Sequence, residues 1–224
     1  MTTRDFQTEF DNLIKEIVNP TLKNLGFKKN ARNYKKSVND IVQVFNIQKS
    51  QWNSADEITF TFNIGFFNSE IFFETQSRSL PNYPKEYDCF LNVGFAKWYK
   101  MNKSISYESL KNEIQSEIET NAVEIFTDYE SLKSLSGLIR KKNITENTMG
   151  ILNMFTFLMK TNNAEDGIKL LKKHYIETLK PKQSTTTFNY PNGQSKTYES
   201  TPKINEEAIN RFKSIAKLYQ INIE

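Results

Sequence analysis

The sequence predicts an α+β protein, with an antiparallel β-sheet of about four strands packed against helices and a C-terminal helical extension. In Glu57–Phe67, large apolar residues alternate with small or polar ones, which is typical of a half-buried antiparallel strand. The stretch before it is also rich in Val, Ile and Phe. From residue 106 onward, apolar residues instead recur every three or four positions, which is the period of an amphipathic helix.

A helix is expected at the N-terminus, starting near Thr3. Its apolar positions are Phe6, Phe10, Leu13, Ile14, Ile17 and Val18. Pro20 has no backbone N–H and should kink or break this helix. Gly26 is well placed as the first residue beyond the helical region.

Four segments are predicted to be strands. They are 33–37, Ile41–Lys49, Glu57–Phe67 and 89–95. A turn is expected at 38–40, because the sequence Val-Asn-Asp favours one. Segment 67–87 contains two prolines and is predicted to be a long connection, a kind of segment that is often functional or mobile.

Helices are expected to dominate after the sheet. Ser106 and Asn163 are placed as N-caps of the first and the fourth of them. The second and third are predicted from apolar residues across 126–139 and 149–159. Pro181 should end this helical run.

The tail is predicted to differ from the rest of the chain. Segment 185–200 is polar and contains Pro-Asn-Gly, so it is either an exposed hairpin or a disordered linker. Asn205 should cap a last helix. We therefore divide the chain into three parts. They are a sheet-and-helix domain at 1–143, a helical pair packed on it at 144–181, and a hairpin or linker with the terminal helix at 182–224.

The composition restricts the chemistry that is open to the chain. One cysteine, Cys89, permits no intrachain disulfide and no thiolate metal cage. The one histidine, His174, lies far along the sequence, so we expect no Cys–His nucleophilic pair. The sequence has no glycine-rich phosphate loop, and no Asp or Glu has Lys two positions later. These features favour a protein that is not an enzyme and uses no cofactor.

The charge and hydropathy patterns also bear on location. A net charge of +4 does not by itself indicate nucleic acid or an anionic membrane as a partner. No apolar run is long enough to span a membrane, and the N-terminus lacks the apolar core of a signal peptide. We expect a cytoplasmic protein with no membrane segment. Abundant Asn, Lys and Ile are typical of an AT-rich bacterial genome.

Two oppositely charged regions are candidate binding surfaces. The basic one consists of Lys23, Lys28, Lys29, Arg32, Lys35 and Lys36, and the acidic one of Glu108, Glu113, Glu117, Glu119, Glu124, Asp128 and Glu130. Phe27 and Tyr34 are interleaved with the bases, a pattern typical of single-strand nucleic-acid binding. The alternative for the basic region is an edge strand whose lysines block edge-to-edge aggregation, and the alternative for the acidic region is a solvated helix face. Two opposed patches fit protein–protein recognition at least as well.

A metal site is a further alternative. Glu86 and Asp88 lie two positions apart at the start of a predicted strand, so both carboxylates could face one way and hold Mg²⁺. Such a pair also arises commonly by chance. A carboxylate–metal hydrolase is therefore retained as one hypothesis.

Several motifs resemble the family named domain of unknown function 4304. They are Pro-Thr-Leu-Lys-Asn-Leu-Gly-Phe at 20–27, Asn-Tyr at 33–34, 44–53, 59–65, Asp-Cys at 88–89, Lys-Trp at 97–98 and the helices of 107–139. The resemblance covers about 5–142 and is sharpest in Gln-Lys-Ser-x-Trp-Asn at 48–53. The chain departs from the family pattern at 90–95, which is mostly apolar, and at Tyr99, which follows Trp98. The resemblance implies an antiparallel sheet with packed helices and brings no catalytic residues.

We expect a non-catalytic binding protein, and specifically a bacterial protein that recognises another protein; a toxin-neutralising immunity role is one concrete form. The candidate contact residues are Gln48, Lys49, Trp52 and Asn53, because hydrophobic packing does not demand these residue types. The alternative for Trp52 is that it covers the sheet edge. The competing hypothesis is a nucleic-acid-binding or nuclease-associated factor that uses Lys28, Lys29, Arg32, Lys35 and Lys36.

Overall fold

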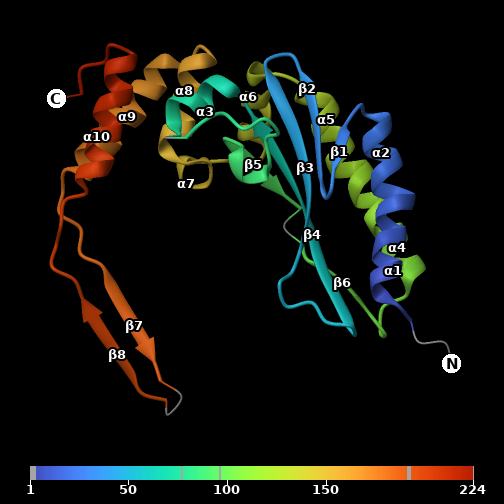
Figure 1. Cartoon of the computed structure of the whole chain (residues 1–224). Coiled ribbons are helices and arrows are strands. Elements are labelled where there is room, and N and C mark those ends of the chain that lie inside the picture. The colour runs from blue at the N-terminus through green and yellow to red at the C-terminus, as the bar shows by residue number, and fades with distance from the viewer. Residues whose placement is uncertain (1–3, 77, 96, 191–192, 224) are drawn as a thin grey trace. The chain divides into compact units, whose positions relative to one another are not determined.

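The fold was obtained as a computed structural model that describes residues 4–76, 78–95, 97–190 and 193–223. The chain divides into two compact units, Met1–Asn153 and Met154–Glu224. The first unit contains a six-stranded antiparallel sheet with helices packed on it, so the predicted α+β class is confirmed (Figure 1).

Strand β4, Glu57–Phe67, lies at the centre of the sheet. Along one edge it pairs with β3 (Ile41–Lys49), which is followed outward by β2 (Asn33–Val38) and β1 (Lys28–Asn30). Along the other edge it pairs first with β6 (Tyr99–Asn102) and then with β5 (Leu91–Gly94). Both edges of β4 are therefore occupied for much of its length.

The four predicted strands are present, but the sheet has two more. The sequence of β1, Lys-Lys-Asn, contains no apolar residue, and β6 is only four residues long. Segments this short show no detectable periodicity, and pairing with β2 and β4 is what makes them strands. The sequence alone therefore did not predict either β1 or β6.

One face of the sheet carries the core of the first unit. Phe45, Phe60, Phe62 and Tyr99 are buried on this face, and their ring centroids lie 5.4–5.7 Å apart in the pairs Phe45–Phe62, Phe60–Phe62 and Phe60–Tyr99. Phe10 from the N-terminal helix packs against Phe60 at 5.0 Å. Figure 1 shows α1, α2, α4 and α5 along this side of the sheet. We call it the helix-covered face.

The N-terminal helical region is continuous through Pro20. It consists of α1 (Phe6–Leu13), a π-helical segment (Ile14–Val18) and α2 (Asn19–Asn24). The expected break does not occur, because the wider π turn ahead of Pro20 accommodates a residue that lacks an N–H. Asp5 caps α1, whereas the predicted start at Thr3 lies outside the described residues. Gly26, with φ of +87°, follows the last turn as expected.

The predicted connection 67–87 contains a helix that the sequence analysis missed. Helix α3 spans Ser69–Thr75 and is capped by the side chain of Asn68, and a short 3₁₀ turn covers Glu86–Asp88. Phe72 of α3 packs with Val44, Phe67 and Cys89 over one end of the second sheet face. The helix is short, and it is this tertiary packing that stabilises it.

A single helix was expected across 126–139, but the structure divides it. Helix α4 spans Tyr107–Glu117 with Ser106 as its cap, and it continues through a π-helical segment (Ile118–Val123) into α5 (Glu124–Asp128). Helix α6 (Leu132–Lys141) then starts afresh. The break occurs because Ser131 forms a capping box with Ser134, which begins a new helix.

The helix predicted across 149–159 is also divided. Met149 ends the short helix α7 (Glu146–Met149), and α8 spans Ile151–Lys160. Gly150 between them has φ of +89°, a conformation that interrupts a right-handed helix.

The second unit contains most of α8, together with α9 (Ala164–Thr178) and α10 (Glu206–Leu218), the last capped by Asn205 as expected. The side chains of Tyr175 and Phe212 pack between α9 and α10, with ring centroids 6.4 Å apart. Segment 185–200 is a hairpin of β7 (Thr185–Asn189) and β8 (Ser195–Glu199). Residues 191 and 192 of the predicted turn lie outside the described residues. Among the helices of the described ranges, none combines the length and the apolar character needed to cross a bilayer.

We predict that Ile64→Asp prevents folding of the first unit. Ile64 is 1% exposed and lies between Phe45 and Val93, so the new carboxylate would have no partner. A buried unpaired charge costs more than about 4 kcal/mol of unfolding free energy. Loss of the thermal unfolding transition in circular dichroism would show this. Asn63→Asp, one residue away on the second face, is the control and should retain the transition.

Candidate functional site

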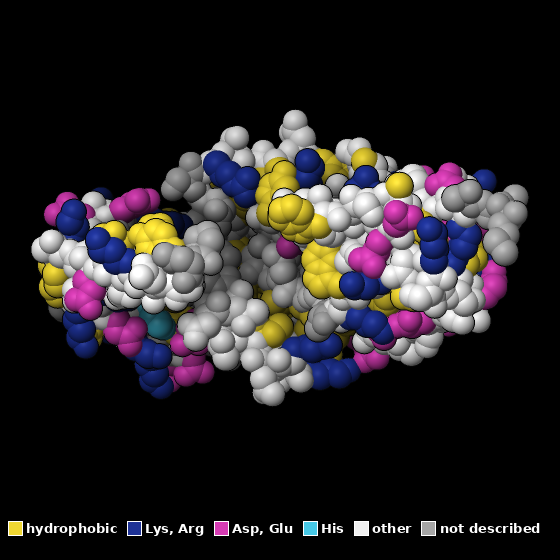
Figure 2. All heavy atoms as spheres, turned by 90° about the horizontal axis from the view of Figure 1, so that it is seen from below, with side chains coloured by type: hydrophobic (Ala, Val, Ile, Leu, Met, Phe, Trp, Pro, Cys, Tyr) yellow, Lys and Arg dark blue, Asp and Glu magenta, His cyan; other side chains and the backbone are white. Residues whose placement is uncertain are grey.

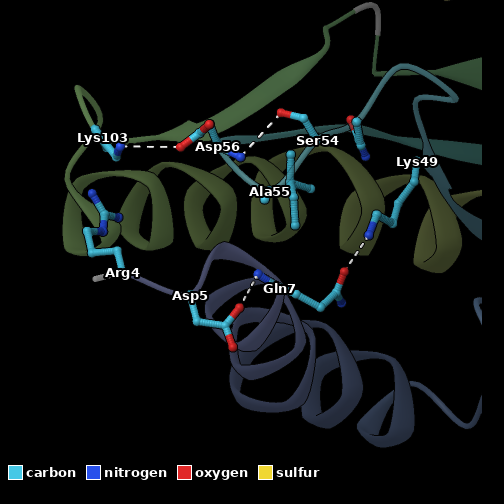
Figure 3. A pocket seen from close by; sticks show the side chains of 10 residues that line it. Arg4, Asp5, Gln7, Lys49, Ser54, Ala55, Asp56 and Lys103 are labelled. Atoms are coloured by element: carbon cyan, nitrogen blue, oxygen red, sulfur yellow. Dashed lines mark hydrogen bonds and ion pairs between the residues drawn. The ribbon is translucent and has the colours of Figure 1, made fainter. Parts of the chain in front are cut away.

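A cavity of about 560 Å³ opens where α1 begins. Its walls come from the start of α1, the end of β3, the β3–β4 loop and the turn after β6 (Figure 3). We call it the α1 pocket. It is lined by Arg4, Asp5, Gln7, Lys49, Asn53, Ser54, Ala55, Asp56, Ile58 and Lys103.

The β3–β4 loop is held in one conformation by its own side chains. The amide of Asn53 accepts a hydrogen bond from Thr59 N at 2.8 Å and donates one to Thr59 O at 3.2 Å, as a neighbouring strand would. The hydroxyl of Ser54 accepts from the backbone N–H groups of Asp56 and Glu57, both at 3.2 Å. The loop that forms this wall of the pocket is therefore an ordered part of the sheet end.

Lys49 lies at one end of the pocket (Figure 3). Its ammonium donates to Gln7 Oε1 at 2.7 Å and lies 5.0 Å from the ring centre of Phe10. Gln7 Nε2 donates in turn to Asp11 at 2.9 Å, which turns the amide oxygen of Gln7 towards Lys49. Burial, and then the positive charge of Arg32, hold the pKa of Lys49 below its ordinary value, although Asp11 opposes them.

The other charged groups of the pocket have closer partners. The Arg4 guanidinium forms two bonds to Glu9, at 2.8 and 2.6 Å. Asp5 caps α1 and accepts from the hydroxyl of Thr8 at 2.6 Å, which lowers the pKa of its carboxyl. Lys103 lies 3.3 Å from Asp56. The pocket thus contains both signs of charge, mostly in neutralised pairs.

The four predicted contact residues do not share one surface. Lys49 and Asn53 line the pocket, and Trp52 precedes Asn53 in the same loop with 85% of its surface exposed. Trp52 therefore does not cover the sheet edge. Gln48 lies on the opposite sheet face, where its Oε1 accepts from Asn63 at 3.0 Å. This second face also carries a row of side-chain amides across β2, β3 and β4.

The basic segment is divided by the alternation of its strands. Lys28 and Lys35 face the second side of the sheet, where the Lys35 ammonium lies 4.2 Å from the ring centre of Tyr83. Lys29 and Lys36 face the helix-covered side, and Lys36 pairs with Glu130 at 2.8 Å. Arg32 lies between β1 and β2. These five residues thus do not form one continuous basic surface.

Several residues of the predicted acidic region are neutralised within the fold. Glu113 pairs with Lys97, Glu124 with Lys141, and Glu130 with Lys36. One of these pairs, Lys36–Glu130, joins the predicted basic region to the predicted acidic region.

The structure brings no catalytic set together at Glu86 and Asp88. Asp88 is 7% exposed and binds the Arg78 guanidinium and the Lys85 N–H, both at 2.8 Å. In the described ranges, no group of three or more His, Cys, Asp or Glu side chains could hold a metal ion. His174 lies in the second unit, 3.1 Å from Glu177 on the same helix.

Sequence reasoning missed Arg4, Asp5, Gln7 and Lys103 as site residues. The cap preference of Asp before an apolar helix could have located Asp5. Gln7 and Lys103 carry no local signal, because they reach the pocket only through the packing of α1 against β4 and β6.

Comparison with known proteins agrees with the family resemblance. The model of the family described as Domain of unknown function (DUF4304) matches residues 18–128. Residues 18–128, from the end of the π-helical segment to the end of α5, are thus a domain of this family. No curated protein and no solved structure is detectably similar to the chain.

We predict that Asn53→Ala loosens the β3–β4 loop. The substitution removes both bonds to the Thr59 backbone, at a cost of about 1–2 kcal/mol in unfolding free energy. Amide hydrogen exchange at Thr59 should accelerate. Asn63→Ala is the control, since its amide bonds only to other side chains, and unchanged Thr59 exchange in Asn53→Ala would contradict the role assigned to Asn53.

We predict that Cys89 is unreactive in the folded protein. Burial, then Glu86 and Asp88, raise the pKa of its thiol well above the ordinary value of 9.0. Alkylation by iodoacetamide at pH 8 should be at least about a hundredfold slower than in guanidinium.

The raised pKa of Cys89 also predicts how the free energy of unfolding depends on pH. Because the unfolded thiol ionises above pH 9 and the folded one does not, this group's contribution to stability is complete below pH 9 and declines above it. Chemical denaturation at pH 8 and pH 10, with Cys89→Ala as control, measures the decline.

Proposed function

We propose that this chain is a non-catalytic bacterial protein that recognises another protein through the α1 pocket and the adjoining Trp52. The observation that carries the proposal is a tryptophan with 85% of its surface exposed on a loop held by four hydrogen bonds of the Asn53 and Ser54 side chains. Tryptophan is strongly enriched among the residues that dominate binding energy at protein interfaces. A loop that is already ordered loses little conformational entropy when a partner binds.

The surface at the sheet end that carries the β3–β4 loop supports the same proposal. Figure 2 views the end of the molecule where the β3–β4 loop lies, and hydrophobic side chains reach this surface among basic and acidic ones. Protein–protein interfaces likewise combine apolar side chains with charged and polar ones. Toxin neutralisation is one form that this recognition could take.

The chemistry of the reactive residues favours binding over catalysis. The one thiol of the sequence is buried, and its raised pKa keeps it protonated. The buried Asp88 carboxylate is neutralised by Arg78. The bases that would contact nucleic acid are divided between two sheet faces, which reduces support for the nucleic-acid alternative.

We predict that Trp52→Ala weakens partner binding about thirtyfold or more, since a tryptophan hot spot contributes at least about 2 kcal/mol. The full chain would be used to isolate a stoichiometric protein complex from its native host, and its affinity would be measured by calorimetry. Phe73→Ala is the matched control, because Phe73 is 74% exposed elsewhere on the first unit. The proposal fails if no stoichiometric partner is found, or if both variants bind alike.

A further inference from the structure

The α1 pocket contains one cation whose partners differ from those of its neighbours. Arg4 has Glu9, and Lys103 has Asp56. Within the described part of the chain, Lys49 has no carboxylate at ion-pair distance, and its ammonium donates to the neutral amide of Gln7. An ammonium carries three donors, and the bond to Gln7 uses one of them.

From this asymmetry we infer that the α1 pocket is a binding site for a single carboxylate on a short aliphatic chain, with Lys49 as its ionic partner. The inference rests on the proposed function, because it assigns the carboxylate to an acidic side chain of the partner protein. Trp52, in the loop that walls the pocket, would then contact the surface around that side chain.

The lining of the pocket determines which anion fits. Ala55 and Ile58 supply apolar surface for a few methylene groups, and Figure 3 shows Ala55 between Lys49 and the Arg4–Lys103 end. Asp5 lines the same cavity, and its negative charge would repel a dianion such as phosphate more than a carboxylate. A polyanionic nucleic-acid backbone is disfavoured for the same reason.

Two further features prepare Lys49 for an anion. Asp11 orients Gln7 so that the amide oxygen, and not the NH₂ group, faces the ammonium. Partial burial, and then the positive charge of Arg32, lower the pKa of Lys49, although the negative charge of Asp11 opposes them from beyond ion-pair distance. A carboxylate in the pocket would supply that charge and should raise the pKa again.

Nuclear magnetic resonance on the full chain tests the inference directly. The probes are N-acetyl-glutamate N-methylamide for a side-chain carboxylate, N-acetyl-alanine for a chain terminus, acetate for a free small carboxylate, and inorganic phosphate. We expect saturable shifts of the Lys49 side chain and the Gln7 amide, a raised pKa of Lys49, and tightest binding of the glutamate probe. Tighter binding of acetate or N-acetyl-alanine would support the site but assign another source of the carboxylate.

Variants identify the ionic partner. Lys49→Gln should weaken binding of the glutamate probe about tenfold or more, whereas Lys49→Arg should retain most of it. Lys133→Gln, the matched control at an exposed lysine of α6 that does not line the pocket, should bind like the natural chain. The inference is overturned if no probe gives saturable shifts, if phosphate binds more tightly than the carboxylates, or if Lys133→Gln loses as much as Lys49→Gln.

The two proposals fail in different ways. If the probes bind at Lys49 but no partner depends on Trp52, protein recognition is wrong and the pocket serves a free carboxylate. If Trp52→Ala abolishes partner binding while no probe binds, protein recognition holds and the carboxylate site is wrong.

Discussion

The pairing of β4 along both of its edges is the constraint on which the first unit depends. Because β3 occupies one edge and β6 and β5 the other, the register of these three strands is fixed by their pairing with β4. The same pairing brings the β3–β4 loop and the turn after β6 to one end of the sheet, where α1 begins. The α1 pocket follows from this arrangement, since its walls come from segments about 50 residues apart in the sequence.

The two faces of the sheet differ because alternate residues along each strand differ. One face is filled with aromatic rings and covered by helices, and the other carries asparagine amides that bond across three strands, with distances of 2.9 Å for Asn46–Asn33 and 3.3 Å for Asn63–Asn46. Position 65 on this second face is a glycine, and a Cβ there would approach Cys89 Sγ to 2.5 Å. The alternation that builds the core also places the lysines of the basic segment on both faces of the sheet, which reduces support for nucleic-acid binding.

The candidate site combines local order with exposed apolar surface. Hydrogen bonds from Asn53 and Ser54 hold the β3–β4 loop, so the exposure of Trp52 is a property of an ordered loop. Exposed tryptophan adds nothing to folding stability, whereas the same ring buried by a partner would contribute strongly to binding. In the described part of the α1 pocket, Arg4 and Lys103 each have a carboxylate at ion-pair distance, whereas Lys49 bonds to the neutral amide of Gln7.

The sequence by itself determined the α+β class, the four longer strands, and the caps at Ser106 and Asn205, because hydrophobic periodicity and cap chemistry are local properties. It could not locate β1, β6 or α3, which are too short to show a period and are stabilised by pairing and packing with distant segments. It identified Lys49 and Asn53 as candidate contacts, but it grouped them with Gln48, which lies on the other sheet face. Only the tertiary structure decided which charges neutralise one another and which side chains line the pocket, because both depend on atoms brought together across the sheet.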